Sequence, residues 1–181
     1  MPVRFSVWRR RLTRGLAAGL VLVGVYAGWA YANGNLHTVV EGELYRSATL
    51  QPERLREVIR SRGIRTIVNL RGHNEHSAWY REETRIAGET DVKLIDLPWS
   101  ASRELTDAQV AAFFEVLADA PRPILIHCRS GADRTGLAAA LYLAAIKKVD
   151  EFTAELQLSP LFGHISLPFA PFYAMDATFE R

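Results

Sequence analysis

The stretch Ile124-Leu-Ile-His-Cys-Arg-Ser-Gly-Ala-Asp-Arg-Thr-Gly136 decides the fold, because it passes from an apolar strand through a short loop into a helix. The first backbone N–H groups of a helix have no partner inside the helix. Together with the positive end of the helix dipole, they make such a loop a place that binds anions. The single cysteine, Cys128, lies at the mouth of this loop, where the same field favours its thiolate.

Arg134 follows Cys128 by six residues and adds a planar guanidinium, which can hold two phosphate oxygens at once. A lone cysteine is more often a small buried hydrophobe than a nucleophile. In this stretch, however, the strand–loop–helix setting, the glycine at 131 and the arginine all occur at offsets that suit catalysis. A nucleophile and a phosphate cradle in one loop predict phosphoryl transfer through a cysteinyl-phosphate.

The segment His127-Cys-x5-Arg134-Thr135-Gly136 resembles the signature of the cysteine-dependent tyrosine and dual-specificity phosphatases. Upstream, Glu43-Leu-Tyr-Arg-Ser47 and Gly63–Arg71 resemble the opening of a dual-specificity domain. The likeness covers residues 37–180 and is most specific in the loop.

The resemblance implies a role for most residues of the loop. Cys128 is the nucleophile and Arg134 binds the phosphate oxygens, while Thr135 assists departure of the thiolate and His127 helps to order the loop. Ser130 either hydrogen-bonds loop amides or is simply small enough to fit. The residues expected to surround the phosphate are Arg129, Ser130, Gly131, Ala132, Asp133 and Arg134.

The donor of the leaving-group proton is harder to assign. Related phosphatases carry an aspartate on the loop after the strand that precedes the active-site strand, but the matching loop here, Pro98–Glu104, has none. The candidates are Asp96 at the end of that strand, Asp133 inside the phosphate loop and Glu104. Asp107 fits better in the first turn of the next helix.

Asp133 is the unusual candidate, and myotubularin-like lipid phosphatases and some bacterial phosphatases also place an acid there. An acid in an anion cradle meets like charge, which favours its protonated form and suits a proton donor. The alternative is that Asp133 points away and pairs with a neighbouring arginine. Arg71 and Arg129 are expected to add positive potential at the mouth and Trp99 to form one wall, although each fits a surface or packing role equally well.

The implied reaction uses no cofactor and no metal. No CxxC or HExxH spacing occurs, and His73 and His76 lie in a polar stretch typical of a surface. A chain with one cysteine forms no internal disulfide. Five of its 22 basic residues fall within the first fourteen positions, so the rest holds 17 basic and 20 acidic residues, which does not fit a nucleic-acid surface.

The amino-terminal region has the pattern of a membrane segment. Gly15–Tyr31 carries no charge, and at 1.5 Å per residue it spans roughly 25 Å. Because arginines precede it, we expect a basic cytoplasmic terminus over 1–14, a single-pass anchor over 15–32 and a catalytic domain over 33–181 outside the cytoplasm. Ala30-Tyr-Ala32 resembles a signal-peptidase site, so a cleaved signal peptide and a secreted or periplasmic domain are the alternative.

Strand and helix patterns alternate after residue 33. The predicted strands are 37–40, 44–46, 64–70, 92–97 and 124–127, and the predicted helices are 52–62, 77–87, 106–118, 134–148, 150–158 and 168–179. This alternation predicts an α/β fold with a central, mostly parallel sheet flanked by helices. Ligands of such sheets gather at the carboxyl ends of the strands, and Cys128 lies at such an end.

These patterns predict a metal-independent phosphatase for phosphate monoesters. The expected partners are the membrane and a substrate that is a phosphotyrosine or phosphoserine protein, an inositol phosphate or a phosphoinositide. The alternative is a pseudophosphatase that binds phosphorylated partners, which the missing loop aspartate favours. Sulfur transfer by a rhodanese-like domain is disfavoured, because those domains lack the Arg134-Thr135 ending at this spacing.

Overall fold

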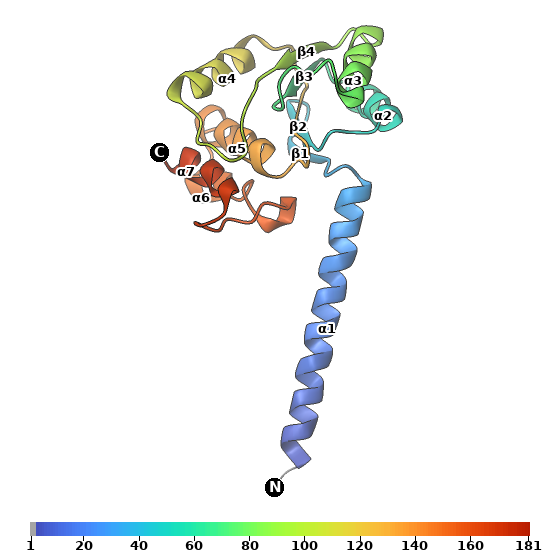
Figure 1. Ribbon diagram of the computed structural model, residues 1–181, viewed down its shortest axis with the longest axis vertical. Helices are drawn as coiled ribbons and strands as arrows, with labels where there is room; N and C mark the ends of the chain where they lie inside the picture. The colour runs from blue at the N-terminus through green and yellow to red at the C-terminus, as the bar shows by residue number, and fades with distance from the viewer. Residues whose placement is uncertain (1–2) are drawn as a thin grey trace. The chain divides into compact units, whose positions relative to one another are not determined.

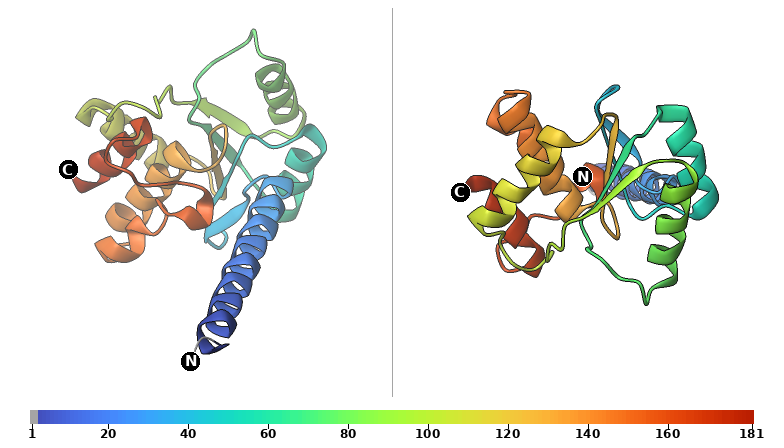
Figure 2. Two further views of the ribbon diagram at one scale, coloured as in Figure 1. Left: turned by 60° about the horizontal axis from the view of Figure 1, so that its bottom comes forward. Right: turned by 90° about the horizontal axis from the view of Figure 1, so that it is seen from above.

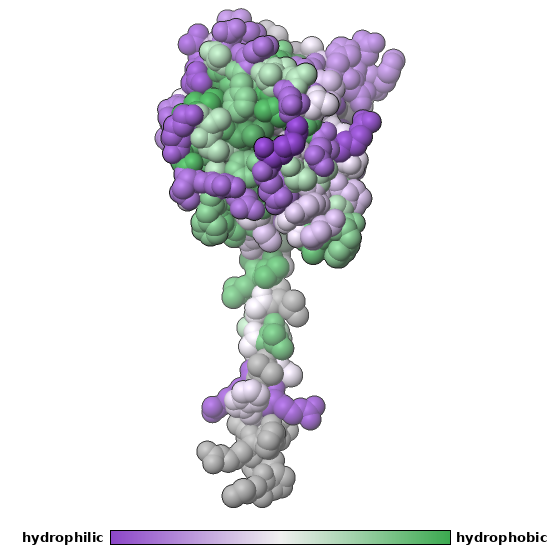
Figure 3. All heavy atoms as spheres, turned by 90° about the vertical axis from the view of Figure 1, so that its left-hand side faces the viewer, coloured by the Kyte–Doolittle hydropathy of each residue, from purple (hydrophilic) through white to green (hydrophobic). Residues whose placement is uncertain are grey.

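The computed structural model describes residues 3–181, which form two compact units that divide between Asn33 and Gly34 (Figure 1). The first unit is a single helix, α1 (Val3–Ala32). Within it, Thr13–Ala32 is long and apolar enough to cross a bilayer, and none of that stretch is buried. Figure 3 shows white and green side chains along this helix, with charged purple ones nearer its beginning. A signal sequence has the same length and composition, so α1 is a candidate for either.

The second unit is built on a five-stranded sheet with the order β1-β2-β5-β3-β4. Four strands run parallel, and β1 pairs with β2 in the antiparallel direction, so the expectation of a mostly parallel sheet is confirmed. The strands are β1 (His37–Val40), β2 (Leu44–Ser47), β3 (Thr66–Asn69), β4 (Lys93–Asp96) and β5 (Ile124–His127).

Helices cover both faces of this sheet, as the alternation along the strands requires. Ile67 and Leu125 pack with α2 (Pro52–Arg62) and α3 (Ala78–Glu89) on one face. Val68 and Ile126 pack on the other face with α4 (Asp107–Asp119), α5 (Asp133–Leu141) and α7 (Ala174–Glu180). Figures 1 and 2 show the two helical layers on opposite sides of the strands.

Residues typical of helix ends bound α2 and α4. Pro52 opens α2, and Gly63 closes it in the left-handed conformation, with φ of 62°. Thr106 and Gln109 form a capping box at the start of α4.

The carboxyl-terminal half of the chain is more broken than predicted. The helix expected over 134–148 begins at Asp133 and gives way to a π-helical turn, η1 (Tyr142–Ile146). Within that turn the buried Tyr142 hydroxyl donates a hydrogen bond to Glu43 at 2.6 Å. The helix expected over 150–158 is only α6 (Glu151–Glu155), and the one expected over 168–179 is the short helix η3 (Pro171–Tyr173) followed by α7.

Two departures from the predicted helix bounds have local causes. The helix predicted over 77–87 continues through Gly88 to Glu89, because glycine weakens a helix without preventing it. Pro160 and Pro171 each begin a separate short helix, because proline donates no backbone hydrogen bond and starts helices rather than continuing them. The first of these helices is η2 (Pro160–Phe162).

Close packing of α5 against α6 and the turn after it yields the first prediction. A Cβ at Gly136 would lie 2.7 Å from the Gln157 carbonyl oxygen, whereas a Cβ at Gly88 meets nothing within 4 Å. Gly136→Ala should therefore lower the free energy of unfolding by about 1 to 3 kcal/mol, and Gly88→Ala should raise it by about 0.5 kcal/mol through helix propensity. Urea unfolding of the full chain in mild detergent measures both. Equal effects of the two variants would contradict the packing described here.

Candidate active site

The candidate site lies at the carboxyl end of the sheet. His127 ends β5, with Ser47 of β2 and Asn69 of β3 beside it in register. Cys128 follows immediately and is only 1% exposed. The loop 128–132 then leads into α5, as the sequence predicts. The cysteine therefore lies at the base of a loop that opens a helix, next to the amino end of that helix.

The loop passes very close to strand β2, and this closeness requires glycine at one position. Gly131 has φ of +73°, a conformation that other residues adopt at a cost in strain. A Cβ there would lie 2.7 Å from the Ala48 nitrogen and from the Ser47 carbonyl carbon. The Ser130 hydroxyl accepts a weak hydrogen bond from the Ala132 amide at 3.4 Å, in line with the expectation that this hydroxyl bonds loop amides.

A buried arginine that the sequence reading missed as a site residue holds the loop from behind. The Arg46 guanidinium donates to the Gly131 carbonyl at 2.8 Å and to the Gln157 carbonyl at 2.9 Å. The same guanidinium lies 4.0 Å from the centre of the Phe162 ring. An arginine inside an otherwise apolar strand is the sequence signal that marks such a residue, because arginine is rarely buried unless it is paired. Asn35 adds a second support by donating to the Ser130 carbonyl at 3.0 Å.

Arg134 is fixed in orientation by backbone carbonyls. One terminal nitrogen donates to the Leu70 oxygen at 3.3 Å and to the Trp99 oxygen at 3.2 Å. The Nε atom of Arg134 is buried and, among the described residues, has no hydrogen-bond partner. The Thr135 hydroxyl is also buried and has no hydrogen-bond partner among the described residues. Unpaired buried donors are unfavourable, so this loop holds polar groups that are ready to bind an acceptor.

Positive charge gathers around the loop. Thr49 donates to the Cys128 carbonyl at 3.0 Å and accepts from Arg71 at 3.0 Å, so Arg71 reaches the mouth as expected. The Arg71 guanidinium stacks 3.5 Å from the centre of the Trp79 ring. Burial, followed by repulsion from Arg134 and Arg129, lowers the pKa of Arg71.

His127 is buried beside a carboxylate from α3. Its Nε2 lies 2.9 Å from Oε1 of Glu83, and both side chains are almost fully enclosed. The sequence reading did not identify Glu83, because its partner is distant in the chain. The buried pair lies directly before Cys128, although neither ring nitrogen of His127 forms a hydrogen bond of good geometry among the described residues.

The three candidate acids have different surroundings. Asp96 lies on β4, separated from β5 by strand β3 and thus about 10 Å from His127 along the sheet. Both of its oxygens accept hydrogen bonds, from Asn69 at 2.7 Å and from the Tyr80 hydroxyl at 2.5 Å. Burial, with the neighbouring Asp96, raises the pKa of Tyr80 to about 12, so this hydroxyl stays a donor. Glu104 lies exposed on its loop.

Asp133 pairs with a histidine rather than with the arginine considered from the sequence. Its Oδ1 lies 2.8 Å from Nδ1 of His164, and Nε2 of His164 lies 2.9 Å from Asp176 on α7. His164 is fully buried, whereas Asp133 is partly exposed. Residues 31 positions apart meet here, and no local pattern in the sequence signals this contact. The Asp133 side chain is thus oriented by a buried imidazole.

The remaining expectations concern the walls of the site. Trp99 is buried and packs against Phe113, so its backbone oxygen rather than its ring contacts Arg134. His73 and His76 are exposed, as expected. Within residues 3–181, no three His, Cys, Asp or Glu side chains gather as a metal site would require.

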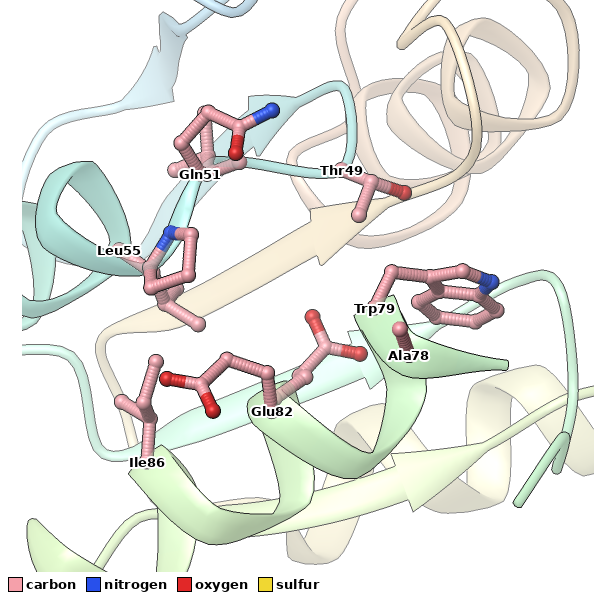
Figure 4. Close-up of a pocket in the computed structure, with 10 residues that line it drawn as sticks. Thr49, Gln51, Leu55, Ala78, Trp79, Glu82 and Ile86 are labelled. Carbon is pink, nitrogen blue, oxygen red and sulfur yellow. The ribbon is translucent and has the colours of Figure 1, made fainter. Parts of the chain in front are cut away.

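A cavity of about 400 Å³ lies beside the loop, between α2 and α3. Figure 4 shows Thr49 and Trp79 on one side of it, Leu55 and Ile86 on the other, and Glu82 below. Thr49 and Trp79 belong to the framework that positions Arg71 and the Cys128 carbonyl. The cavity therefore adjoins the mouth of the site.

Fold and site together define a class of protein: an α/β protein in which a cysteine lies in a loop at the carboxyl end of a mostly parallel sheet, with an arginine in the first turn of the helix that follows. The chain belongs to the tyrosine phosphatase family, whose sequence model matches residues 26–153.

Individual relatives agree with this assignment. The dual specificity protein phosphatase TpbA of Pseudomonas aeruginosa strain UCBPP-PA14 is 32% identical over 113 residues, which are 61% of this chain and 47% of that protein. The chain therefore spans about half the length of the curated relatives that it matches. The crystal structure of P. aeruginosa TpbA superposes with a TM-score of 0.61 and 25% identity, covering 81% of this chain and 83% of that one.

A more distant structure shows the same fold. The core catalytic domain of the PP-IP phosphatase SIW14 from S. cerevisiae superposes with a TM-score of 0.63 at 21% identity. The superposed region covers 80% of this chain and 83% of the SIW14 domain.

The Asp133–His164–Asp176 contact predicts how stability depends on pH. Burial disfavours the imidazolium, but the hydrogen bonds to the two carboxylates outweigh burial and raise the pKa of His164. A group with a raised folded-state pKa stabilises the fold most below its unfolded value of about 6.5, and the contribution falls as pH rises through the raised pKa. Wild type should therefore lose more stability than His164→Gln between about pH 6 and pH 9 in urea unfolding. Parallel stability curves for the two proteins would contradict this prediction.

Proposed function

We propose that the protein hydrolyses phosphate monoesters through a cysteinyl-phosphate on Cys128. The observation that carries the proposal is the Nε of Arg134, which is buried and has no hydrogen-bond partner among the described residues, in the first turn of the helix that the Cys128 loop opens. A phosphate oxygen supplies the acceptor that this donor lacks. Membership of the tyrosine phosphatase family and the relationship to a dual specificity phosphatase support the same activity.

In the proposed first step, the Cys128 thiolate attacks phosphorus, so that an S–P bond forms and the ester P–O bond breaks. The loop amides, from Arg129 to Arg134, and the Arg134 guanidinium stabilise the equatorial oxygens. An acid gives its proton to the departing oxygen. In the second step the same carboxylate takes a proton from water, the water oxygen attacks phosphorus and the thiolate leaves with inorganic phosphate as the product. Thr135, whose hydroxyl is buried without a partner among the described residues, assists the thiolate.

We assign the acid to Asp133. It is the first residue of α5, directly after the loop, is partly exposed and is oriented by His164 at 2.8 Å. Asp96 has both oxygens occupied and lies about two strand spacings from β5. Glu104 lies on an exposed loop segment. Of the three, Asp133 is nearest to Cys128 in the sequence, five residues away, and its side chain is oriented by His164.

The substrate is a phosphorylated protein, an inositol phosphate or a phosphoinositide. One neighbour in the fold is TpbA, crystallised in complex with pTyr, and another is the PP-IP phosphatase SIW14. The cavity beside Thr49 and Trp79 offers room for part of the leaving group. A panel of these esters distinguishes between the substrate classes.

We further propose that α1 anchors the protein in a membrane, with the basic residues 1–14 in the cytoplasm and the catalytic domain 33–181 outside it. The support is the uncharged stretch preceded by five arginines. Cleavage near Ala32 would instead release a secreted or periplasmic domain.

Cys128→Ser tests the nucleophile. The variant should lose turnover of an aryl phosphate by at least about three orders of magnitude, because an alcohol is a far weaker nucleophile than a thiolate at this site. It should still bind inorganic phosphate or vanadate, since Arg134 and the loop amides remain. Turnover and calorimetric binding are measured on the same preparation. Residual turnover near the wild-type level would refute the cysteinyl-phosphate.

Replacement of each acid by its amide tests the proton donor. Asp133→Asn keeps the acceptor for His164 but cannot donate the catalytic proton. Its kcat should fall by about 10²- to 10⁴-fold with poor leaving groups and much less with good ones. Asp96→Asn and Glu104→Gln are the matched controls, and their losses should not depend on the leaving group. A leaving-group dependence confined to Asp96→Asn or Glu104→Gln would move the assignment to that residue.

The alternative function is a pseudophosphatase that binds phosphorylated partners. The expected result for wild type is turnover on at least one ester of the panel, with Cys128→Ser binding the same ester unchanged. Binding without turnover on every aryl phosphate and inositide would favour the binding module.

A further inference from the structure

One segment of the catalytic unit is exposed although it is apolar. Residues 156–175 contain no Asp, Glu, Lys or Arg. Within its part 161–175, Phe169 is 84% exposed, and four other large apolar side chains are also exposed. We call the set the apolar rim: Leu161, Ile165, Leu167, Phe169 and Phe172. Figure 1 shows the orange-to-red segment that carries it at the edge of the catalytic unit, outside α5.

The apolar rim is fastened to the start of the catalytic unit. The Asn35 side chain donates to the Phe162 carbonyl at 2.9 Å, and the His37 ring packs edge-on against the Phe162 ring at 4.9 Å between centroids. Asn35 is three residues after Ala32, the last residue of α1. The rim segment is therefore fastened to the first residues of the catalytic unit, which follow α1 directly in the sequence.

The same segment is fastened to the phosphate loop. Asn35 also donates to the Ser130 carbonyl, and Arg46 bridges the Gly131 carbonyl and the Phe162 ring. One residue before Ile165, His164 is buried against Asp133. Apolar rim, phosphate loop and chain entry thus lie together at one end of the catalytic unit.

From this arrangement we infer that the apolar rim docks on the surface of a lipid bilayer and holds the phosphate loop beside the lipid headgroups. Exposed aromatic and aliphatic side chains on an uncharged segment suit the boundary between headgroups and acyl chains. The segment fits a protein partner less well than a bilayer. Protein interfaces surround their apolar centre with polar and charged groups, and residues 156–175 contain no Asp, Glu, Lys or Arg. The inference rests on the proposed membrane attachment but is independent of turnover.

The docking is tested with the full chain, one molecule per phosphatidylcholine nanodisc. An environment-sensitive fluorophore is attached at Phe169→Cys in a Cys128→Ser background, which leaves one thiol. The control label is at Arg60→Cys, an exposed position on α2, which packs on the opposite face of the sheet. Lipid-borne nitroxide should quench the label at 169 at least about threefold more strongly than the label at 60, because only residues at the bilayer surface meet the quencher.

Two outcomes would overturn the inference. One is equal quenching at the two positions. The other is a difference in quenching between the two positions that occurs only in discs that hold two chains. That result would make the rim an interface between copies of this chain.

A kinetic arm uses the native cysteine. The double variant Leu161→Ser and Phe169→Ser should lose about tenfold in turnover of a phosphate monoester carried on a lipid in the same disc, because docking aligns the loop with the surface. It should retain wild-type turnover of a soluble aryl phosphate. The matched control, Glu57→Ser with Arg60→Ser, should change neither rate. Equal losses on both substrates would contradict the role of the rim. Absence of turnover by wild type would refute the proposed function, while the quenching arm would still decide the docking.

Discussion

The structure depends above all on the buried guanidinium of Arg46. It lies in a central strand, fully enclosed, and binds the Gly131 carbonyl of the phosphate loop together with the Gln157 carbonyl after α6. A buried charge is costly unless it is hydrogen-bonded, so the bonds from its terminal nitrogens to these carbonyls and its contact with the Phe162 ring hold the guanidinium in place. The contact therefore fixes the loop on the sheet and also fixes the carboxyl-terminal segment on the loop. Asn35 and His164 repeat the pattern, each joining that segment to a loop residue.

With the loop fixed in this way, the electrostatics of the site follow. Burial first, and then the charges of the nearby Arg134 and Arg129, lower the pKa of Arg71. Such a concentration of positive charge is unfavourable without an anion. Carbonyl contacts from Leu70 and Trp99 orient Arg134 yet leave its Nε unpaired among the described residues, so the loop is preorganised for an oxyanion rather than closed upon itself.

The sequence predicted the parts of this molecule that local patterns encode. The five strands, the capping box at Thr106 and the glycine after α2 were all readable, because each rests on residues a few positions apart. The position of Cys128 between β5 and α5 was readable for the same reason. The partners of His127 and Asp133 were not, since Glu83 and His164 approach them only through the tertiary fold. The interruptions of the helices after residue 142 could not be predicted, because an apolar pattern does not show where a π-helical turn or a new helix beginning at proline interrupts a helix.

The central claim is that a sulfur atom in this loop carries the phosphoryl group. Rapid acid quench of the Asp133→Asn variant with an aryl phosphate, followed by peptide mass spectrometry, tests it directly, because loss of the acid that activates water slows breakdown of the intermediate. One phosphoryl group on the peptide that contains Cys128, absent from a Cys128→Ser double variant, is the predicted result. Product release from wild type, with no phosphorylated cysteine at any quench time in the variant, would contradict the account.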